Sequence, residues 1–458
     1  MGSMKNFQEN HRRPSYNNRG QINFTGLTML GLGGAIGSGI FVASGIAVNQ
    51  AGPSIILAFV IGGIISTLIM RMLAEMSVHE PTNGSFSVYA QEYLGPNLGF
   101  TSGWMYWMAG ILTLATEMVA AALIVRFWLP YLPIWLISLI IAMVIIGISF
   151  LDVRVFARVE EILSFIKVGI LLVVIGMGIV LFAGFWPELK SPGIVNYLGY
   201  GGFFPHGSSG FFSSLLLVLF TYAGEQVIGS AAAETQDPVK TVPKAVNVIN
   251  VTLVFVYLGA ITTLVGIVPW NQIPQNGSSF VPLLRQLGLS GISSIMNAVI
   301  LSAILSAMNS NMYGVPRMLK SLAERHDAPV FLAGENRRGV PVAAVLISSA
   351  FLLIVAGISY LLPQEIFTYI AGSAGVALIL NWLIIAVTYY CFRKQVKSNS
   401  DVRLLKSPGF PYSTIIAIIL LSVVLATSVL GKNQIVGLVV GTITMLAFSG
   451  VFALVKGR

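Results

Sequence analysis

The sequence contains two glycine-interrupted apolar stretches that decide the fold, GLGGAIGSG at residues 31–39 and FTYAGEQ at residues 220–226. Each lies inside an apolar run long enough to form a helix. The first holds five glycines in nine residues, and each glycine costs a helix about 1 kcal/mol relative to alanine. We therefore expect both helices to be interrupted at these stretches.

The chain around these stretches consists mainly of apolar runs. A helix crosses a hydrocarbon core of about 30 Å with about 20 mostly apolar residues. Only 9% of the 458 residues are charged, against roughly 25% in soluble domains. The sequence therefore predicts an all-α integral membrane protein of about 12 transmembrane helices. The expected spans lie near residues 25–47, 53–76, 98–127, 134–151, 162–185, 211–232, 246–269, 292–320, 341–361, 367–392, 412–430 and 434–455.

The basic residues predict the orientation of these spans, because lysine and arginine in short loops mark the cytoplasmic side. Of the 26 lysines and arginines, 21 fall on one set of alternate loops and 4 on the other. Lys167 belongs to neither set, since it lies inside a span. We expect a protein of the cell membrane with both termini in the cytoplasm.

The interrupted stretches fall in the first and sixth spans. Glycine also serves close packing between membrane helices, so the first stretch alone is open to that simpler explanation. Interruptions at matching places in two halves are typical of transporters built from inverted repeats, and a repeat of five spans inverts the second half. We divide the chain into a cytoplasmic tail (1–20, of which 1–3 resemble a tag remnant), a first repeat (21–190), a second repeat (205–392) and two final helices (409–458).

Unwound backbone in a membrane is tolerable only where it lines a cavity or binds something. Free N–H groups at the start of a half-helix suit a carboxylate, and free carbonyl groups at the end of one suit an ammonium. The two groups together describe an α-amino acid.

Several other classes of function are excluded or disfavoured. The net charge of +9 is explained by the loops, so no nucleic-acid partner is expected. Cys391 is the single cysteine, and no metal cluster appears; we expect no cofactor. The spans show neither a catalytic set, which argues against an enzyme, nor the charged rings of a channel pore.

Several motifs resemble the amino acid, polyamine and organocation superfamily, and specifically its bacterial amino acid transporter branch. They are GGAIGSGIF at 33–41, EP at 80–81 with GSF at 84–86, AETQDPVKTVPKA at 233–245, and LSAMNS at 305–310 followed by RML at 317–319. The resemblance covers the chain from about residue 24 to the end of span ten, and more weakly beyond it. It implies a five-plus-five inverted repeat with broken helices 1 and 6, two extra C-terminal helices, and alternating access.

The resemblance also implies positions of the substrate site. Gly37, Ser38 and Gly39 match the carboxylate-binding turn, Ala35 and Ala223 offer carbonyls to the substrate ammonium, and Phe220 is an aromatic lid. The candidate substrate-binding residues are Ala35, Ile36, Gly37, Ser38, Gly39, Glu117, Phe220, Thr221, Ala223, Gly224 and Glu225.

Lys167 is the first of three ionisable residues inside the spans, where a functional role is the default hypothesis. In the functional interpretation its ammonium replaces the sodium of sodium-coupled relatives and bridges span one to span eight, where Ser306 or Ser310 accepts its hydrogen bond. Burial disfavours the charged form of a lysine, which allows it to load and release a proton. The alternative is a lysine that snorkels to the cytoplasmic interface.

Glu117 and Glu225 are the other two ionisable residues. The resemblance places Glu117 on the wall of the substrate side-chain pocket, while the alternative is a protonated carboxyl group bonded to a neighbouring helix. The family pattern in span six is glycine, a variable residue and then glutamate, whereas Gly224 is followed here directly by Glu225 and then Gln226. Glu225 either faces the pocket, which favours a cationic substrate, or braces span one.

We expect a monomeric secondary transporter of L-α-amino acids, with proton-coupled uptake of a neutral amino acid across the lipid bilayer. A carrier of cationic amino acids or histidine and an amino acid exchanger remain open. A membrane nutrient sensor on a carrier scaffold is the alternative from another class.

Overall fold

A computed structural model describes residues 22–82, 85–150, 153–186, 189–337, 339–361, 366–396, 407, 409–431 and 434–456. The predicted tail, residues 1–20, and several of the basic loop residues lie outside this part of the chain. The described residues form helices joined by short loops, with one isolated bridge between Ile22 and Thr235. The all-α prediction is confirmed.

The twelve predicted spans are present as helices. Span one comprises α2 (Phe24–Ala35), η1 (Gly39–Ala43) and α3 (Ser44–Ala51), and span six comprises α10 (Gly207–Thr221) and α11 (Val227–Ala231). The other spans are α4 (Ile55–His79), α6 (Pro96–Val125), α7 (Ile134–Ile148), α8 (Val153–Phe182), α12 (Pro238–Ile267), α14 (Ser293–Glu324), α15 (Val342–Leu361), α16 (Ile366–Gln395), α17 (Tyr412–Thr427) and α18 (Gln434–Lys456).

Length and composition support this count within the described residues. Nine helical stretches there are long and apolar enough to cross a membrane, and the first, Phe24–His79, contains both span one and span two in its 56 residues. The shorter apolar helices α7 and α10 supply spans four and six.

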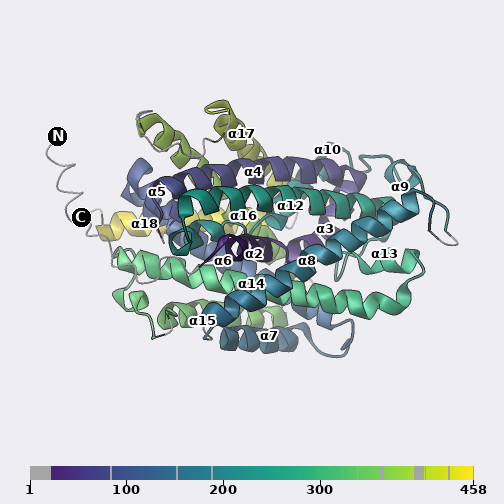
Figure 1. Ribbon diagram of the computed structural model, residues 1–458, viewed down its shortest axis with the longest axis horizontal. Helices are drawn as coiled ribbons and strands as arrows, with labels where there is room; N and C mark the ends of the chain where they lie inside the picture. Colours follow the sequence, from purple (N-terminus) through teal and green to yellow (C-terminus); the bar gives the residue numbers. More distant parts are fainter. Residues whose placement is uncertain are drawn as a thin grey trace.

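The helices run side by side along the longest axis of the molecule (Figure 1). The short helix α5 (Ser85–Leu94) lies at one end, and α9 (Val195–Leu198) and α13 (Val281–Gln286) lie at the other. The end with α5 also carries Arg317, Lys320, Arg325, Arg393 and Lys394, all near the ends of α14 and α16. We call it the basic end.

Burial separates a central group of helices from a peripheral one. The most apolar windows of α6 and α16 are 78% and 83% buried, whereas those of α17 and α18 are 28% and 11% buried. A helix that is apolar all round and buried belongs to the core of a bundle. The last two helices pack against α16 from outside, as expected for an addition to a five-plus-five repeat.

A buried carboxylate joins three segments at the basic end. Glu75 of α4 accepts hydrogen bonds from the Tyr389 hydroxyl at 2.7 Å, from Arg393 Nη1 at 2.6 Å and from the Ser407 N–H at 2.7 Å. The Glu75 side chain is 2% exposed, so these donors replace water around its charge. The carboxylate therefore ties α4 to α16 and to the segment that precedes α17.

We predict that Glu75→Ala lowers the free energy of unfolding by about 2 kcal/mol, because hydrogen bonds to a buried charge are lost and their donors are left unpaired. A thermal-shift measurement on the detergent-purified protein checks this. Glu324→Ala is the control. The Glu324 side chain pairs with Lys320 but is 44% exposed, and exposed ion pairs contribute little to stability. Equal melting temperatures for the two variants would contradict this role.

Candidate functional site

Span one is interrupted for only two residues. Helix α2 ends at Ala35, and the next residue, Ile36, leaves the helical conformation with φ −84° and ψ 93°. Ile36 and Gly37 are unwound, and Ser38 is helical again before the wide turn of η1. The break predicted from the glycines is present, and Ser38 is the first residue of the second half-helix.

Span six is interrupted over Tyr222–Gln226, between α10 and α11. Gly224 has φ +100°, a backbone conformation that glycine adopts without the steric cost met by other residues. The Ala223 N–H donates to the Phe220 carbonyl at 2.9 Å, so the chain closes a turn before Gly224. The glycine of the FTYAGEQ stretch therefore provides the left-handed backbone conformation at the break.

The two breaks cross in direct backbone contact. A Cβ atom on Gly34 would lie 2.8 Å from the Gly224 carbonyl oxygen, and one on Gly39 would lie 2.6 Å from the Thr221 Cα. Real Cβ atoms essentially never approach other atoms so closely. The glycines of span one therefore permit the approach of span six, in addition to weakening the helix.

Glu117 lies directly on the turn of span one. Its Oε2 accepts a hydrogen bond from the Ser38 N–H at 2.8 Å, and a Cβ atom on Gly37 would lie 2.5 Å from its Oε1. Glu117 comes from α6 and is 4% exposed. The Glu117 carboxyl group thus binds the free N–H of the second half-helix, and its place on the wall of the side-chain pocket stays a prediction.

Lys167 of α8 contacts the other side of the break. The side chain is fully buried, and its Nζ donates to the Gly33 carbonyl at 2.6 Å. One turn earlier on α8, the Ser164 hydroxyl donates to the Met29 carbonyl at 2.9 Å. Lys167 thus does not snorkel to the interface in this structure, and α8 binds α2 through two side chains.

Ser306 and Ser310, the expected acceptors on α14, are both buried. The Ser310 hydroxyl makes no hydrogen bond, so it does not accept one from Lys167 in this conformation. A role of Ser306 stays a prediction.

The Ala35 carbonyl, expected to receive the substrate ammonium, accepts a hydrogen bond from the Tyr257 hydroxyl of α12 at 2.9 Å. Tyr222 lies beside it, with ring centroids 5.2 Å apart, and donates its hydroxyl to the Phe59 carbonyl at 3.0 Å. A carbonyl oxygen has a second lone pair, so Ala35 keeps acceptor capacity. Sequence reasoning missed both tyrosines; their position inside apolar spans was the available signal.

Glu225 has a hydrogen-bond partner that the sequence did not suggest. Its carboxyl group accepts a hydrogen bond from the Ser66 hydroxyl of α4, and the residue is fully buried. The adjacent Gln226 accepts from Trp382 Nε1 of α16 at 3.0 Å. Glu225 therefore braces span six against span two through one carboxyl oxygen, while its Oε2 has no hydrogen-bond partner. Whether it also faces the substrate stays a prediction.

The remaining candidate residues surround the crossing. Ile36, Phe220, Thr221 and Ala223 are all buried, and Phe220 and Thr221 form the last turn of α10. Among the described residues no group of three histidine, cysteine or acidic side chains could hold a metal ion. The site as described thus consists mainly of backbone groups and the carboxyl group of Glu117.

The two ends of the bundle differ in their contacts. At the basic end, Ile22 pairs with Glu234 and Gln236 through backbone hydrogen bonds of 3.2 and 2.9 Å, and the Glu234 carboxylate accepts from the Tyr313 hydroxyl at 2.6 Å. At the opposite end, a cavity of about 340 Å³ is lined by residues that include Arg126 and Arg285. The chain before α2 and the chain after α11 are therefore joined at the basic end.

We predict that Gly34→Ala destabilises the protein by about 1–3 kcal/mol, because the added methyl group meets a backbone oxygen that cannot rotate away. Thermal-shift measurements on purified protein check this. Gly176→Ala in α8 is the matched control, since nothing lies within 4 Å of its added Cβ and alanine favours a helix. A Gly34→Ala protein as stable as Gly176→Ala would show that the crossing is looser than described.

Comparison with known proteins places this site in a family. The model of the amino acid permease family matches residues 26–455. The gamma-aminobutyric acid permease of Bacillus subtilis (strain 168) is 36% identical over 423 residues, which cover 91% of this chain and 90% of that protein. The aromatic amino acid transport protein AroP of Escherichia coli (strain K12) is 34% identical over 400 residues, or 87% of each chain. This chain is a multi-pass membrane protein that belongs to the amino acid permease family.

Proposed function

We propose that this permease imports a neutral amino acid together with protons, by alternating access around the crossing of spans one and six. The observation that carries the proposal is the hydrogen bond from the Ser38 N–H to the Glu117 carboxyl group. A turn that holds a carboxyl group of the protein is suited to hold the carboxylate of a substrate.

The substrate would bind by exchange with Glu117. Its carboxylate takes the N–H groups of the turn at Gly37, Ser38 and Gly39, and Glu117 is released. The substrate ammonium then finds the Glu117 carboxyl group and the Ala35 and Ala223 carbonyls as acceptors. Phe220 and Thr221 lie at the end of α10, where they would contact the substrate side chain.

Two observations favour a neutral side chain. Glu225, which would attract a cationic side chain if it faced the pocket, is hydrogen-bonded to Ser66 of α4. The relatives are named for gamma-aminobutyric acid and for aromatic amino acids, and these substrates carry no net charge as zwitterions. A cationic amino acid or histidine remains the second candidate, because Glu117 is an acid in the site.

Lys167 is the proposed proton site. Its Nζ bonds the Gly33 carbonyl, one residue from the crossing at Gly34. A charged donor makes a stronger hydrogen bond than a neutral one, so loss of the proton would weaken the contact between α8 and α2. Proton loading would therefore favour the arrangement in which α8 contacts α2.

Alternating access requires the contacts at one end to open while those at the other close. We propose that the basic end faces the cytoplasm, with both termini on that side, and that the protein acts as a monomer. Release of substrate to the cytoplasm would then break the pairing of Ile22 with Glu234 and Gln236, together with the Tyr313 contact. An exchanger would use the same opening without net proton flow.

The substrate class is tested by a thermal-shift screen of the twenty amino acids and γ-aminobutyrate on purified protein. We expect neutral amino acids to raise the melting temperature, since a ligand at 100 times its Kd adds about 2.7 kcal/mol to stability. Arginine, lysine or histidine as the sole stabilising ligands would overturn the neutral assignment. Uptake of the labelled ligand into proteoliposomes then separates a carrier from a sensor, which binds without translocation.

The proton site is tested with Lys167→Ala in the same proteoliposomes. We expect accumulation driven by an inward proton gradient to be lost, because the group that couples the proton to α2 is absent, while ligand-induced stabilisation is retained. Lys190→Ala is the control, because Lys190 is an exposed loop residue that belongs to neither break. Normal gradient-driven accumulation by Lys167→Ala would rule out Lys167 as the coupling residue.

A further inference from the structure

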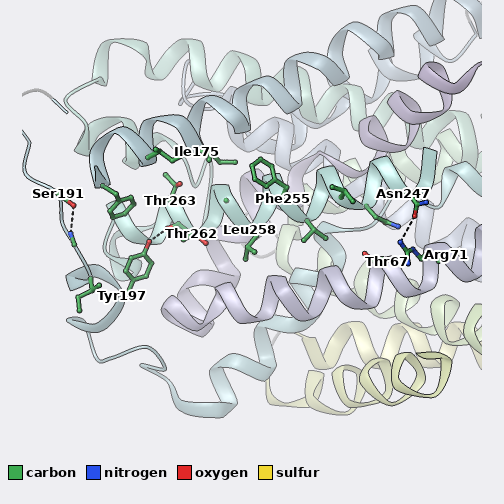
Figure 2. Close-up of a pocket in the computed structure, with 18 residues that line it drawn as sticks. Thr67, Arg71, Ile175, Ser191, Tyr197, Asn247, Phe255, Leu258, Thr262 and Thr263 are labelled. Carbon is green, nitrogen blue, oxygen red and sulfur yellow. Dashed lines mark hydrogen bonds between the residues drawn. The ribbon is translucent and has the colours of Figure 1, made fainter. Parts of the chain in front are cut away.

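A groove separate from the breaks lies between α4, α8 and α12, with a volume of about 1020 Å³ (Figure 2). Its lining residues on α12 include Asn247, Val251, Phe255, Leu258 and Thr262. They recur every three or four residues and therefore form one face of the helix. Val251 and Phe255 are 70% and 60% exposed, so the protein leaves this face uncovered.

The groove is longer than one membrane leaflet, because its lining continues past Leu258 to Thr263 of α12 and to Tyr197 of α9. The part next to Asn247 is the part that one leaflet would reach. Asn247 and Leu258 are 11 residues apart on α12, which corresponds to about 16 Å along a helix. Half of a hydrocarbon core is about 15 Å. An acyl chain of the leaflet at the basic end would therefore extend from Asn247 to Leu258.

The groove ends in a cationic and amide-rich site. Arg71 Nη2 donates to Asn247 Oδ1 at 3.1 Å (Figure 2), and within the described part of the chain no carboxylate lies within salt-bridge distance of Arg71. Lys244 is exposed and precedes Asn247 by one turn, so the two side chains are neighbours on α12. An arginine that has no acidic partner can bind a phosphate through charge-assisted hydrogen bonds.

Asn250 provides an independent sign of a missing ligand. It lines the groove and is only 4% exposed, yet neither its amide nitrogen nor its amide oxygen has a hydrogen-bond partner. Buried amides are normally paired. If the Asn250 side chain rotates toward the groove, a polar group near Arg71 would supply the partner.

We propose that the groove binds an anionic phospholipid of the leaflet at the basic end. Its phosphate lies on Arg71 with Lys244 nearby, a headgroup or ester oxygen meets Asn250, and an acyl chain follows Val251, Phe255 and Leu258. The charge of the site favours an acidic lipid over a zwitterionic one. The site is distinct from the amino acid site and does not depend on which substrate is carried.

Native mass spectrometry of the detergent-purified full chain tests the proposal. Phosphatidylglycerol, phosphatidylethanolamine and inorganic phosphate are added separately at matched concentrations. We expect a phosphatidylglycerol adduct in the wild type and in Arg71→Lys, a loss of about fivefold in its affinity in Arg71→Gln, and weaker adducts with the other two ligands. Val251→Trp, which fills the exposed apolar part of the groove, should weaken the same adduct without removing a charge.

Lys394→Gln is the matched control, because Lys394 is an exposed cation of the same end on α16 and lies outside the groove. It should bind phosphatidylglycerol as the wild type does. Equal affinities for Arg71→Gln and Lys394→Gln, or equal binding of phosphatidylethanolamine by the wild type, would overturn the anionic site. Binding of inorganic phosphate with unchanged affinity in Val251→Trp and no lipid adduct, or occupation of the groove by a copurified transmembrane peptide, would also overturn it.

Discussion

Backbone groups without helical partners cannot be left bare inside a membrane, and this constraint shapes the centre of the protein. The breaks at Ile36–Gly37 and Tyr222–Gln226 free N–H and carbonyl groups where no water competes for them. Three neighbouring helices supply partners. Glu117 of α6 takes an N–H, while Lys167 of α8 and Tyr257 of α12 each donate to a carbonyl of α2.

These partners also restrain movement. Lys167 and Tyr257 bind the first half-helix of span one, and Glu117 binds the residue that begins the second. A tilt of span one relative to all three neighbouring helices would therefore break at least one contact. Span one can therefore change its position only if these contacts are exchanged for others. In the proposed cycle Lys167 changes its charge and Glu117 changes its partner, whereas the Tyr257 hydroxyl stays uncharged near neutral pH.

Much of the fold was predictable from the sequence, because apolar runs and glycine clusters report directly on the membrane and on helix breaks. The direction of individual side chains was not. Glu225 and Gln226 are neighbours that turn to α4 and α16, since one residue rotates a side chain by about 100° on a helix and the break alters that angle again. The three donors to Glu75 come from residues more than 300 positions away, and sequence spacing carries no sign of them.

The proposed exchange of Glu117 for a substrate carboxylate would limit which ligands can bind. A ligand with a carboxylate alone would have to displace Glu117 into a buried position without a new partner, and an unpaired buried charge is costly. An amine alone would leave the turn occupied and would reach only the carbonyls. A molecule with both groups restores a partner to the turn through its carboxylate and to Glu117 through its ammonium. In the proposed exchange, the internal carboxyl group would thus favour amino acids over simpler acids and amines.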